Sequence, residues 1–435
     1  MKSILSYIIL AAVLLASCSK EDDPVFSETA DQRINRVLAE YEAALTSSPN
    51  GWNAEMTTKN EVTYRFHFSF DKSNRVKMFS DFDGTTAAVR KESSYRLKAL
   101  QQPALLFDTY SYIHILTDPA DSISGGPVGV GLNADFEFSL DSLSADLIKL
   151  TGRQQGSKMI LRKASAQDAD AWQTGKWAGG SVLAGINKRI LNYWKRLTVG
   201  TRQYEIVIDP SFHTLEFTWR NAAGTPQRHT TSFNYSAEGM ILTEPLQDGA
   251  NTITSLSAAT WNNGTAAFTL TVNNNTAGRI AGAIAPIVND ANAPERWWNE
   301  GLQDYWRTVG GFTVNGVWNA YKLANLKDYY YLAFLEQWEE VDGVEVDIFG
   351  FVFLGGNGLE LRYGLATYPP VFTGGRIVFP QYGVLGTIPP EAEDAFYNTA
   401  ITLINPNGFY LVQTGQNRYD MVSASDAKSW ITWQR

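Results

Sequence analysis

The feature that most constrains the fold is an alternation of aromatic and polar side chains with a period of two. Between residues 64 and 70 every second side chain is Tyr or Phe, and the residues between them are polar. Side chains of a β-strand point alternately to its two faces, so this spacing predicts a strand with one buried face. Residues 71–74 then have the composition of a turn, and Val76 and Met78 predict a returning strand.

A similar layout returns twice further along the chain. Alternating strands that begin at Tyr204 and Phe349 are each followed by a turn and a returning strand, and residues 377–379 predict a further strand in the third copy. The copies begin 140 residues (204 − 64) and 145 residues (349 − 204) apart. A degenerate repeat of a β-meander explains this spacing, and chance similarity between the strands of any β-rich chain is the alternative. Because short turns join the strands, mostly antiparallel sheets are expected.

Helical periodicity is confined to a few segments. Thr29 with Gln32 three residues later has the pattern of a capping box, and the helix that follows is predicted to end at residues 49–51 (Pro-Asn-Gly). Residues 186–197 and 294–307 also place apolar side chains at helical spacing. Further strands are predicted at residues 105–116, 134–140, 149–151, 158–162 and 430–433.

The amino-terminal residues have the pattern of a bacterial lipoprotein signal. Lys2 precedes an apolar run over residues 4–15, which is shorter than the about 20 apolar residues that a membrane span needs. Leu-Ala-Ser-Cys at residues 15–18 matches a lipobox, which predicts cleavage before Cys18 and acylation of its thiol, for example by palmitate. An ordinary signal peptide with a chance cysteine is the alternative. Residues 19–23 (Ser-Lys-Glu-Asp-Asp) resemble the surface-export signal of Bacteroidota lipoproteins, with a plain solvated tether as the alternative.

These patterns together predict a mainly β chain (β-rich α+β). We expect two or three antiparallel units of the meander, barrel-like or sandwich type behind an amino-terminal helix. The predicted boundaries are 1–17 for the signal peptide, 18–28 for the acylated tether, 29–166 for a first β-rich domain, 181–285 for a second unit and 294–435 for a third.

Composition limits the classes of partner and chemistry. The 435 residues carry 36 Lys and Arg against 45 Asp and Glu, a net charge of −9. An acidic chain has no electrostatic affinity for nucleic acid or for an anionic membrane, so membrane contact is expected through the lipid on Cys18 and no nucleic acid is expected to bind. Cys18 is the single cysteine, which excludes an intramolecular disulfide.

Common catalytic motifs do not occur in the sequence. There is no His-Glu-x-x-His pattern and no Gly-x-Ser-x-Gly, and the glycines of residues 125–131 lack the Gly-Lys-Ser/Thr ending of a phosphate-binding loop. We therefore expect neither a cofactor nor an enzyme. The four histidines form no metal-binding pattern: His67, His114, His213 and His229. His67 and His114 are expected on strands, as polar-face or hydrogen-bonded residues rather than ligands.

The candidate site residues fall into three groups. Asp81 and Asp83, in Asp-Phe-Asp-Gly, have the start of a calcium loop without its twelfth-position Glu, so a simple turn is favoured and no metal site is predicted. Asp135 and Glu137 are expected on one strand face, either as converging carboxyls or as the solvated side of an amphipathic strand. The third group is either a sugar-stacking surface or a helix buried against a sheet: Trp297, Trp298, Tyr305 and Trp306.

Several short motifs occur together in the first third of the chain. They are Asp31–Asn35, Pro49–Trp52, Ser80–Asp83, Ser94–Leu97, Gln102–Pro103, Phe107–Leu116, Asp135–Phe138 and Leu150–Arg153. With them the chain resembles a family of Bacteroidota lipoproteins, the domain of unknown function 4302 family, most clearly over residues 31–163. The resemblance implies a surface lipoprotein of the outer membrane, often encoded beside a TonB-dependent transporter and its lid lipoprotein. It implies no catalytic or binding residues.

Three functions are compatible with these features. The first is a non-enzymatic binding accessory of a nutrient-uptake system, with a glycan, a peptide or a cofactor as cargo. The second is a structural or adhesive surface protein without a small ligand. The third is a hydrolase, which requires two carboxyl groups about 5–10 Å apart in a concave site.

Overall fold

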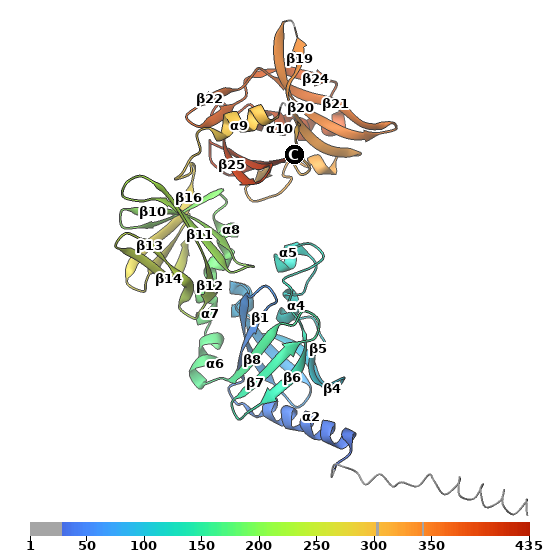
Figure 1. The fold of residues 1–435 in the computed structure, drawn as a ribbon, viewed down its shortest axis with the longest axis vertical. Helices are drawn as coiled ribbons and strands as arrows, with labels where there is room; N and C mark the ends of the chain where they lie inside the picture. Colours follow the sequence, from blue (N-terminus) through green and yellow to red (C-terminus); the bar gives the residue numbers. More distant parts are fainter. Residues whose placement is uncertain (1–27, 302–303, 342) are drawn as a thin grey trace, which may run out of the picture.

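The computed structural model describes residues 28–301, 304–341 and 343–435, and Cys18 lies outside these ranges. Three β units follow one another along an elongated molecule (Figure 1). The first two units are closed antiparallel barrels of eight strands, and the described part of the third unit forms an 11-stranded sheet. The mainly β prediction is therefore confirmed. Within the described ranges, no helix is both long enough and apolar enough to span a membrane.

Barrel 1 begins with the predicted helix α2 (Ala30–Ser47), and its capping box is confirmed. The Thr29 side chain accepts from the Gln32 N–H, and the Gln32 side chain accepts from the Thr29 N–H. Eight strands follow in sequence order, and the last pairs with the first to close the barrel. Their bounds are β1 (Trp52–Thr57), β2 (Thr63–Phe70), β3 (Arg75–Ser80), β4 (Lys91–Ala99), β5 (Pro103–Phe107), β6 (Glu137–Leu143), β7 (Leu147–Gly152) and β8 (Lys158–Lys163).

The helix α2 packs on one end of barrel 1. Tyr41 and Leu45 are buried in the barrel core, and the Trp52 indole donates to the Leu45 carbonyl at 2.9 Å. The aromatic residues of the alternating run at residues 64–70 point into the same core. Figure 1 shows α2 at one end of the barrel and the excursion between β5 and β6 at the other.

The strand predicted over residues 105–116 is wrong after residue 107, because this excursion begins there. The strand β5 ends at Phe107, and the short helices α4 (Tyr112–Ile115) and α5 (Asp121–Ser124) follow. His114 therefore lies in a helix and not on a strand. Its Nδ1 accepts from the Ser111 N–H at 3.1 Å, so a local capping interaction replaces the sheet ladder that the apolar spacing suggested.

Barrel 2 repeats this construction after a helical connection. The segments that precede it are α6 (Ala166–Gln173), α7 (Lys176–Gly180), η1 (Val182–Gly185) and α8 (Ile186–Arg189). The eight strands again run in sequence order, and β16 closes on β9. Their bounds are β9 (Trp194–Val199), β10 (Arg202–Asp209), β11 (Thr214–Arg220), β12 (Pro226–Tyr235), β13 (Gly239–Asp248), β14 (Asn251–Asn262), β15 (Ala267–Val272) and β16 (Thr276–Ala283).

The helix predicted over residues 186–197 is wrong in its second half. The helix α8 ends at Arg189, and β9 begins at Trp194. Trp194 and Leu197 are the buried residues of β9, and the two residues between them are partly exposed. This spacing of three within a strand imitates the period of a helix.

The third unit differs from the barrels. Its helices are α9 (Ala293–Glu300), η2 (Leu323–Asn325), η3 (Pro390–Ala392) and α10 (Glu393–Leu403). The hairpin β20–β21 is present as predicted. The strand at residues 376–378 pairs with β22 and β25, however, so the prediction of a third copy of the meander is wrong. The strands are β17 (Trp306–Thr308), β18 (Thr313–Val314), β19 (Tyr329–Val341), β20 (Val344–Gly355), β21 (Gly358–Thr367), β22 (Val371–Thr373), β23 (Arg376–Val378), β24 (Gln381–Gly386), β25 (Phe409–Gly415), β26 (Arg418–Ser423) and β27 (Ser429–Gln434).

The two barrels meet at a buried junction of polar and aromatic side chains. The Tyr64 hydroxyl of barrel 1 donates to the Ser211 carbonyl of barrel 2, and the Arg65 guanidinium donates to the Tyr235 carbonyl at 2.9 Å. The His213 ring lies 4.7 Å from the Tyr64 ring. These contacts fix the orientation of one barrel relative to the other.

Candidate functional site

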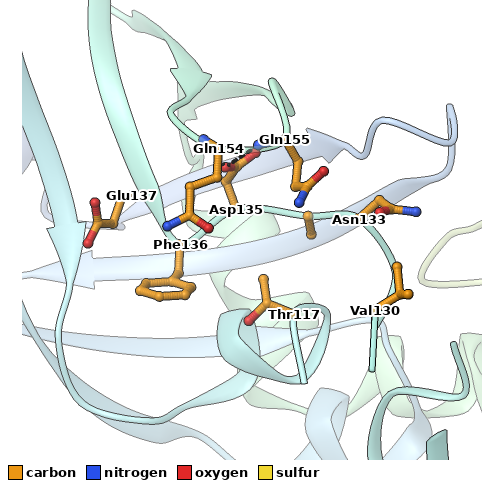
Figure 2. Close-up of a pocket in the computed structure, with 9 residues that line it drawn as sticks. Thr117, Val130, Asn133, Asp135, Phe136, Glu137, Gln154 and Gln155 are labelled. Atoms are coloured by element: carbon orange, nitrogen blue, oxygen red, sulfur yellow. Dashed lines mark hydrogen bonds between the residues drawn. The ribbon is translucent and has the colours of Figure 1, made fainter. Parts of the chain in front are cut away.

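The candidate site is a hollow of about 200 Å³ (Figure 2), at the end of barrel 1 opposite α2 (Figure 1). Three segments form it: the excursion at residues 108–136, the first residue of β6, and the turn at residues 153–157 between β7 and β8. The lining residues are Thr117, Val130, Asn133, Ala134, Asp135, Phe136, Glu137, Gln154 and Gln155.

Asp135 holds the turn at residues 153–157 in place. Its Oδ1 accepts from the backbone N–H groups of Gln154 at 2.7 Å and Gln155 at 2.9 Å. Its Oδ2 accepts from the Ser157 N–H at 3.0 Å and the Ser157 hydroxyl at 2.5 Å. The carboxylate is only 3% exposed, and the four donors occupy both of its oxygens. The sequence interpretation of Asp135 as part of a solvated strand face is therefore wrong, because Asp135 precedes β6 and is buried.

Gly152 allows this close approach. A Cβ atom at residue 152 would lie 2.0 Å from the Asp135 Oδ2, which no side chain tolerates. Because residue 152 is glycine, the Asp135 carboxylate can come close enough to hold the backbone of Gln154 and Gln155.

Four of the other lining side chains carry flat polar groups and one is aromatic. Glu137 and Asn133 are half-buried, Gln154 is exposed, and Phe136 is half-buried between them. Figure 2 shows Glu137, Gln154 and Phe136 on one side of the hollow, and Gln155 and Asn133 on the other. Amide groups both donate and accept hydrogen bonds, whereas the carboxylate accepts only. None of the nine described lining residues is cationic.

The ring of Phe136 is supported from behind by His114, at 4.8 Å between ring centroids. The His114 Nε2 lies 3.1 Å from the Phe107 carbonyl, and burial lowers the pKa of His114. A neutral imidazole therefore positions the aromatic face without adding charge to the hollow.

The family model described as Domain of unknown function (DUF4302) matches residues 22–263, more than half of the chain. The chain belongs to the DUF4302 family. The match includes all of barrel 1 with the candidate site, and it ends just after β14 of barrel 2. The two strands that close barrel 2 therefore lie beyond the family match. A search of curated proteins found no match.

In this DUF4302 protein, most of the aromatic residues that were candidates for a sugar-stacking surface lie in the hydrophobic core. Trp297 and Trp306 are fully buried, and the Trp306 indole donates to the Trp297 carbonyl at 2.8 Å. The Trp297 ring packs on Phe334 at 4.7 Å. A sugar-stacking role for Trp297 and Trp306 is therefore wrong, because both residues are fully buried. The helix predicted over residues 294–307 is also wrong in its second half, because α9 ends at Glu300 and Trp306 begins β17.

Trp298 and Tyr305 remain partly exposed, but they lie in different surroundings. The Trp298 indole donates to the Asp347 carboxylate at 2.9 Å, and the Tyr305 hydroxyl lies 2.7 Å from the Tyr331 hydroxyl. Burial raises the pKa of Asp347 to about 6. These two aromatic residues do not share a surface with the hollow of barrel 1.

Asp81 and Asp83 also have structural roles. The Asp81 Oδ1 accepts from the Arg65 N–H at 2.8 Å, and burial raises the pKa of Asp81 to about 7. Asp83 is the N-cap of α3 (Gly84–Ala88) and accepts from Thr85 and Thr86. Across the described ranges, no three His, Cys, Asp or Glu side chains are placed to hold a metal ion.

The amide residues of the site could not be recognised from periodicity in the sequence. Asn133, Gln154 and Gln155 lie in connections, which carry no periodic signal. The available signal was the Gln-Gln pair between the strands predicted at residues 149–151 and 158–162, since turns rarely need two long amide side chains.

Proposed function

We propose that this protein binds a glycan in the hollow of barrel 1 and performs no chemistry on it. The observation that carries the proposal is that amide and carboxylate side chains line the hollow together with the aromatic ring of Phe136. Sugar hydroxyl groups both donate and accept hydrogen bonds, which amides and carboxylates complement, and the apolar face of a sugar ring packs on an aromatic ring. The absence of a cation among the nine described lining residues favours a neutral sugar at this position over an anionic ligand.

Glycoside hydrolysis is disfavoured by the state of the two carboxyls. A hydrolase needs one carboxyl as a general acid and a second as nucleophile or base. Four hydrogen-bond donors occupy Asp135, which leaves Glu137 as the other carboxyl among the nine described lining residues. This arrangement supports binding over catalysis.

Affinity electrophoresis against neutral polysaccharides, followed by calorimetry with the matching oligosaccharides, tests the proposal. Gln154→Ala is expected to weaken binding at least about tenfold, since each lost hydrogen bond to an uncharged group contributes about 1 kcal/mol and the amide makes two. Gln101→Ala is the matched control, because Gln101 is exposed at the opposite end of barrel 1. Equal affinity of the two variants would place binding elsewhere, and no retention by any polysaccharide would contradict glycan binding.

We also propose that the protein is held on the outer face of the outer membrane by acyl chains on Cys18. The lipobox at residues 15–18 and the acidic residues at 19–23 support this address. Metabolic labelling with an alkynyl fatty acid is expected to mark the protein and to fail for Cys18→Ser. Protease treatment of intact cells should remove the labelled protein; protection from protease would place it on the inner side.

The proposed partners are a TonB-dependent transporter and its lid lipoprotein, to which the protein delivers its cargo. The resemblance of residues 31–163 to the family supports this association. Crosslinking on intact cells, followed by purification of this protein, is expected to recover the transporter. Recovery of host matrix proteins instead would favour the adhesive function.

A further inference from the structure

The two barrels are copies of one construction. Each is preceded by helical segments whose apolar residues close one end of its core: α2 in barrel 1, and η1 with α8 in barrel 2. Each then runs through eight strands in sequence order and closes the first strand on the last. Strand β1 therefore corresponds to β9, and each later strand of barrel 1 corresponds to the strand eight numbers higher.

The barrels are stacked with the same polarity. The turn at residues 210–213 joins β10 to β11, so it corresponds to the β2–β3 turn on the α2 end of barrel 1. This end of barrel 2 contacts barrel 1, through Ser211 with Tyr64 and through Tyr235 with Arg65. The other end of barrel 2 corresponds to the end of barrel 1 that carries the candidate site.

A second hollow, of about 350 Å³, lies at that corresponding end. It is formed by the beginning of β14, where β6 begins in barrel 1, and by the turn at residues 273–275, which corresponds to the turn at 153–157. Asn251 is the first residue of β14, as Glu137 is the first residue of β6. Arg202, at the start of β10, completes the rim.

A buried carboxylate positions the rim of this hollow too. Asp248 is almost fully buried, accepts from the Tyr204 hydroxyl at 3.0 Å, and forms an ion pair with the Arg202 guanidinium, with 3.0 Å between the nitrogen and the carboxylate oxygen. The Asn273 side chain locks the neighbouring turn, because its amide donates to the Thr252 carbonyl and its oxygen accepts from the Thr254 N–H. Arg202 remains about one third exposed. The planar guanidinium is thus held in one orientation with donors left for a ligand.

We infer that the second hollow is a glycan subsite equivalent to the first, and that the two barrels hold successive parts of one polysaccharide chain. The inference rests on the proposed function of barrel 1 and extends it to a polymeric ligand. Asn251 and Thr252 supply hydrogen-bonding groups, and Arg202 donates to sugar oxygens, hydroxyl or carboxylate. The second subsite therefore accepts an acidic sugar unit, whereas the first, with Glu137, disfavours one.

Chain length is the property that two subsites on one rigid body select. Once one part of a polysaccharide is bound, the other part has a high effective concentration at the second subsite. A chain long enough to reach both is expected to bind roughly 100-fold more tightly than a short fragment of the same glycan. A protein with one subsite shows no such gain.

Hydrogen–deuterium exchange on the full chain tests the two sites separately. The probes are soluble xylan, mannan and homogalacturonan, which present neutral and acidic sugars. The first site is read from residues 130–137 and 153–157, and the second from 249–253 and 272–276. Protection of both supports the inference, and protection of the first alone overturns it while the proposed function stands. Protection of the second alone, or of neither, overturns both.

A pair of variants then tests the link between the subsites. Asn251→Ala is expected to remove most of the roughly 100-fold gain in affinity for long chains over short fragments. Asn187→Ala is the matched control, since Asn187 is an exposed residue of α8 at the other end of barrel 2. An Asn251→Ala variant that binds long chains as tightly as the control overturns the inference.

Discussion

The junction between the barrels predicts an unusual dependence of stability on pH. Asp81 and His213 are both buried there, and both lie within the field of Arg65. Burial raises the pKa of Asp81 from 3.8 to about 7, and burial lowers the pKa of His213 from 6.5 to about 3. Other ionisable groups face the same junction: Glu55, Tyr64, Asp83, Asp209 and Tyr235.

The two shifts act in opposite directions on the free energy of unfolding. Between pH 4 and 7 folded Asp81 holds a proton that the unfolded chain has lost, so stability falls as pH rises, by about 4 kcal/mol in total. Between pH 3 and 6.5 the unfolded chain binds a proton that folded His213 refuses, so stability rises with pH, by about 5 kcal/mol in total. Each slope is about 1.4 kcal/mol per pH unit. From pH 4 to 6.5 the two contributions cancel.

Single substitutions are expected to separate the two contributions to the pH dependence of the free energy of unfolding. Asp81→Asn keeps an oxygen to accept from the Arg65 N–H and does not titrate, so the stability of this variant should rise from pH 4 to 6.5. His213→Asn suits the backbone, because residue 213 has a φ of 48° and Asn adopts this conformation more easily than most residues. Its stability should fall over the same range. The double variant should again be nearly flat.

Urea unfolding of the full chain at half-unit pH steps measures these differences. Hydrogen exchange on strands β2 and β11 identifies the transition that belongs to the junction. The difference between each variant and the parent removes the contribution of all other carboxyls. A difference profile for Asp81→Asn that stays within about 1 kcal/mol from pH 4 to 7 would refute the assignment of a proton to Asp81 at neutral pH.

Three further outcomes follow from the described contacts. Asp135→Asn turns one acceptor oxygen into a donor that faces other donors, and is expected to lower the stability of barrel 1 by about 3 kcal/mol in urea unfolding and to abolish glycan binding. Trp297→Ala is expected to lower the stability of the third unit by about 3–5 kcal/mol in calorimetry without changing glycan affinity, whereas Trp318→Ala, 65% exposed, should cost less than about 1 kcal/mol. Trp298→Phe removes a donor to Asp347 and is expected to raise the pKa of that carboxyl above about 6, which carbon-detected NMR titration can follow.

Patterns between near neighbours in the sequence predicted the elements of the fold well. The capping box at Thr29 and the alternation over residues 64–70 depend on contacts within one element, and both are confirmed. The alternation also predicted strands in both barrels. It could not predict closure, because the pairing of β1 with β8 joins segments about 100 residues apart that carry no mark of their partnership. Nor could it show that the strand at residues 376–378 leaves the meander.

The candidate site was predicted least well, for a physical reason. Trp297 and Trp306 attract attention as large aromatic residues, yet aromatic residues are also what a β core requires, and the core is where they lie. Asp135 was recognised as a residue of interest, but its four hydrogen-bond donors come from a turn about 20 residues later in the chain. A carboxylate that binds ligand and one that holds a turn have the same local sequence.

Closed barrels of this kind place their aromatic residues inside and their specific surfaces at the ends. Every backbone group of an inner strand is paired, and the bulky side chains that fill the barrel leave no interior cavity for a ligand. Variation is then concentrated in the connections at each end.

In barrel 1, α2 covers one end, so the excursion at residues 108–136 and the turn at 153–157 remain as the place for a ligand. Because barrel 2 is stacked with the same polarity, its open end carries the second hollow rather than facing barrel 1. Head-to-tail stacking therefore places the second hollow at the end of barrel 2 that points away from barrel 1, whereas the end of barrel 1 that carries the first hollow also carries the contacts of Tyr64 and Arg65 with barrel 2.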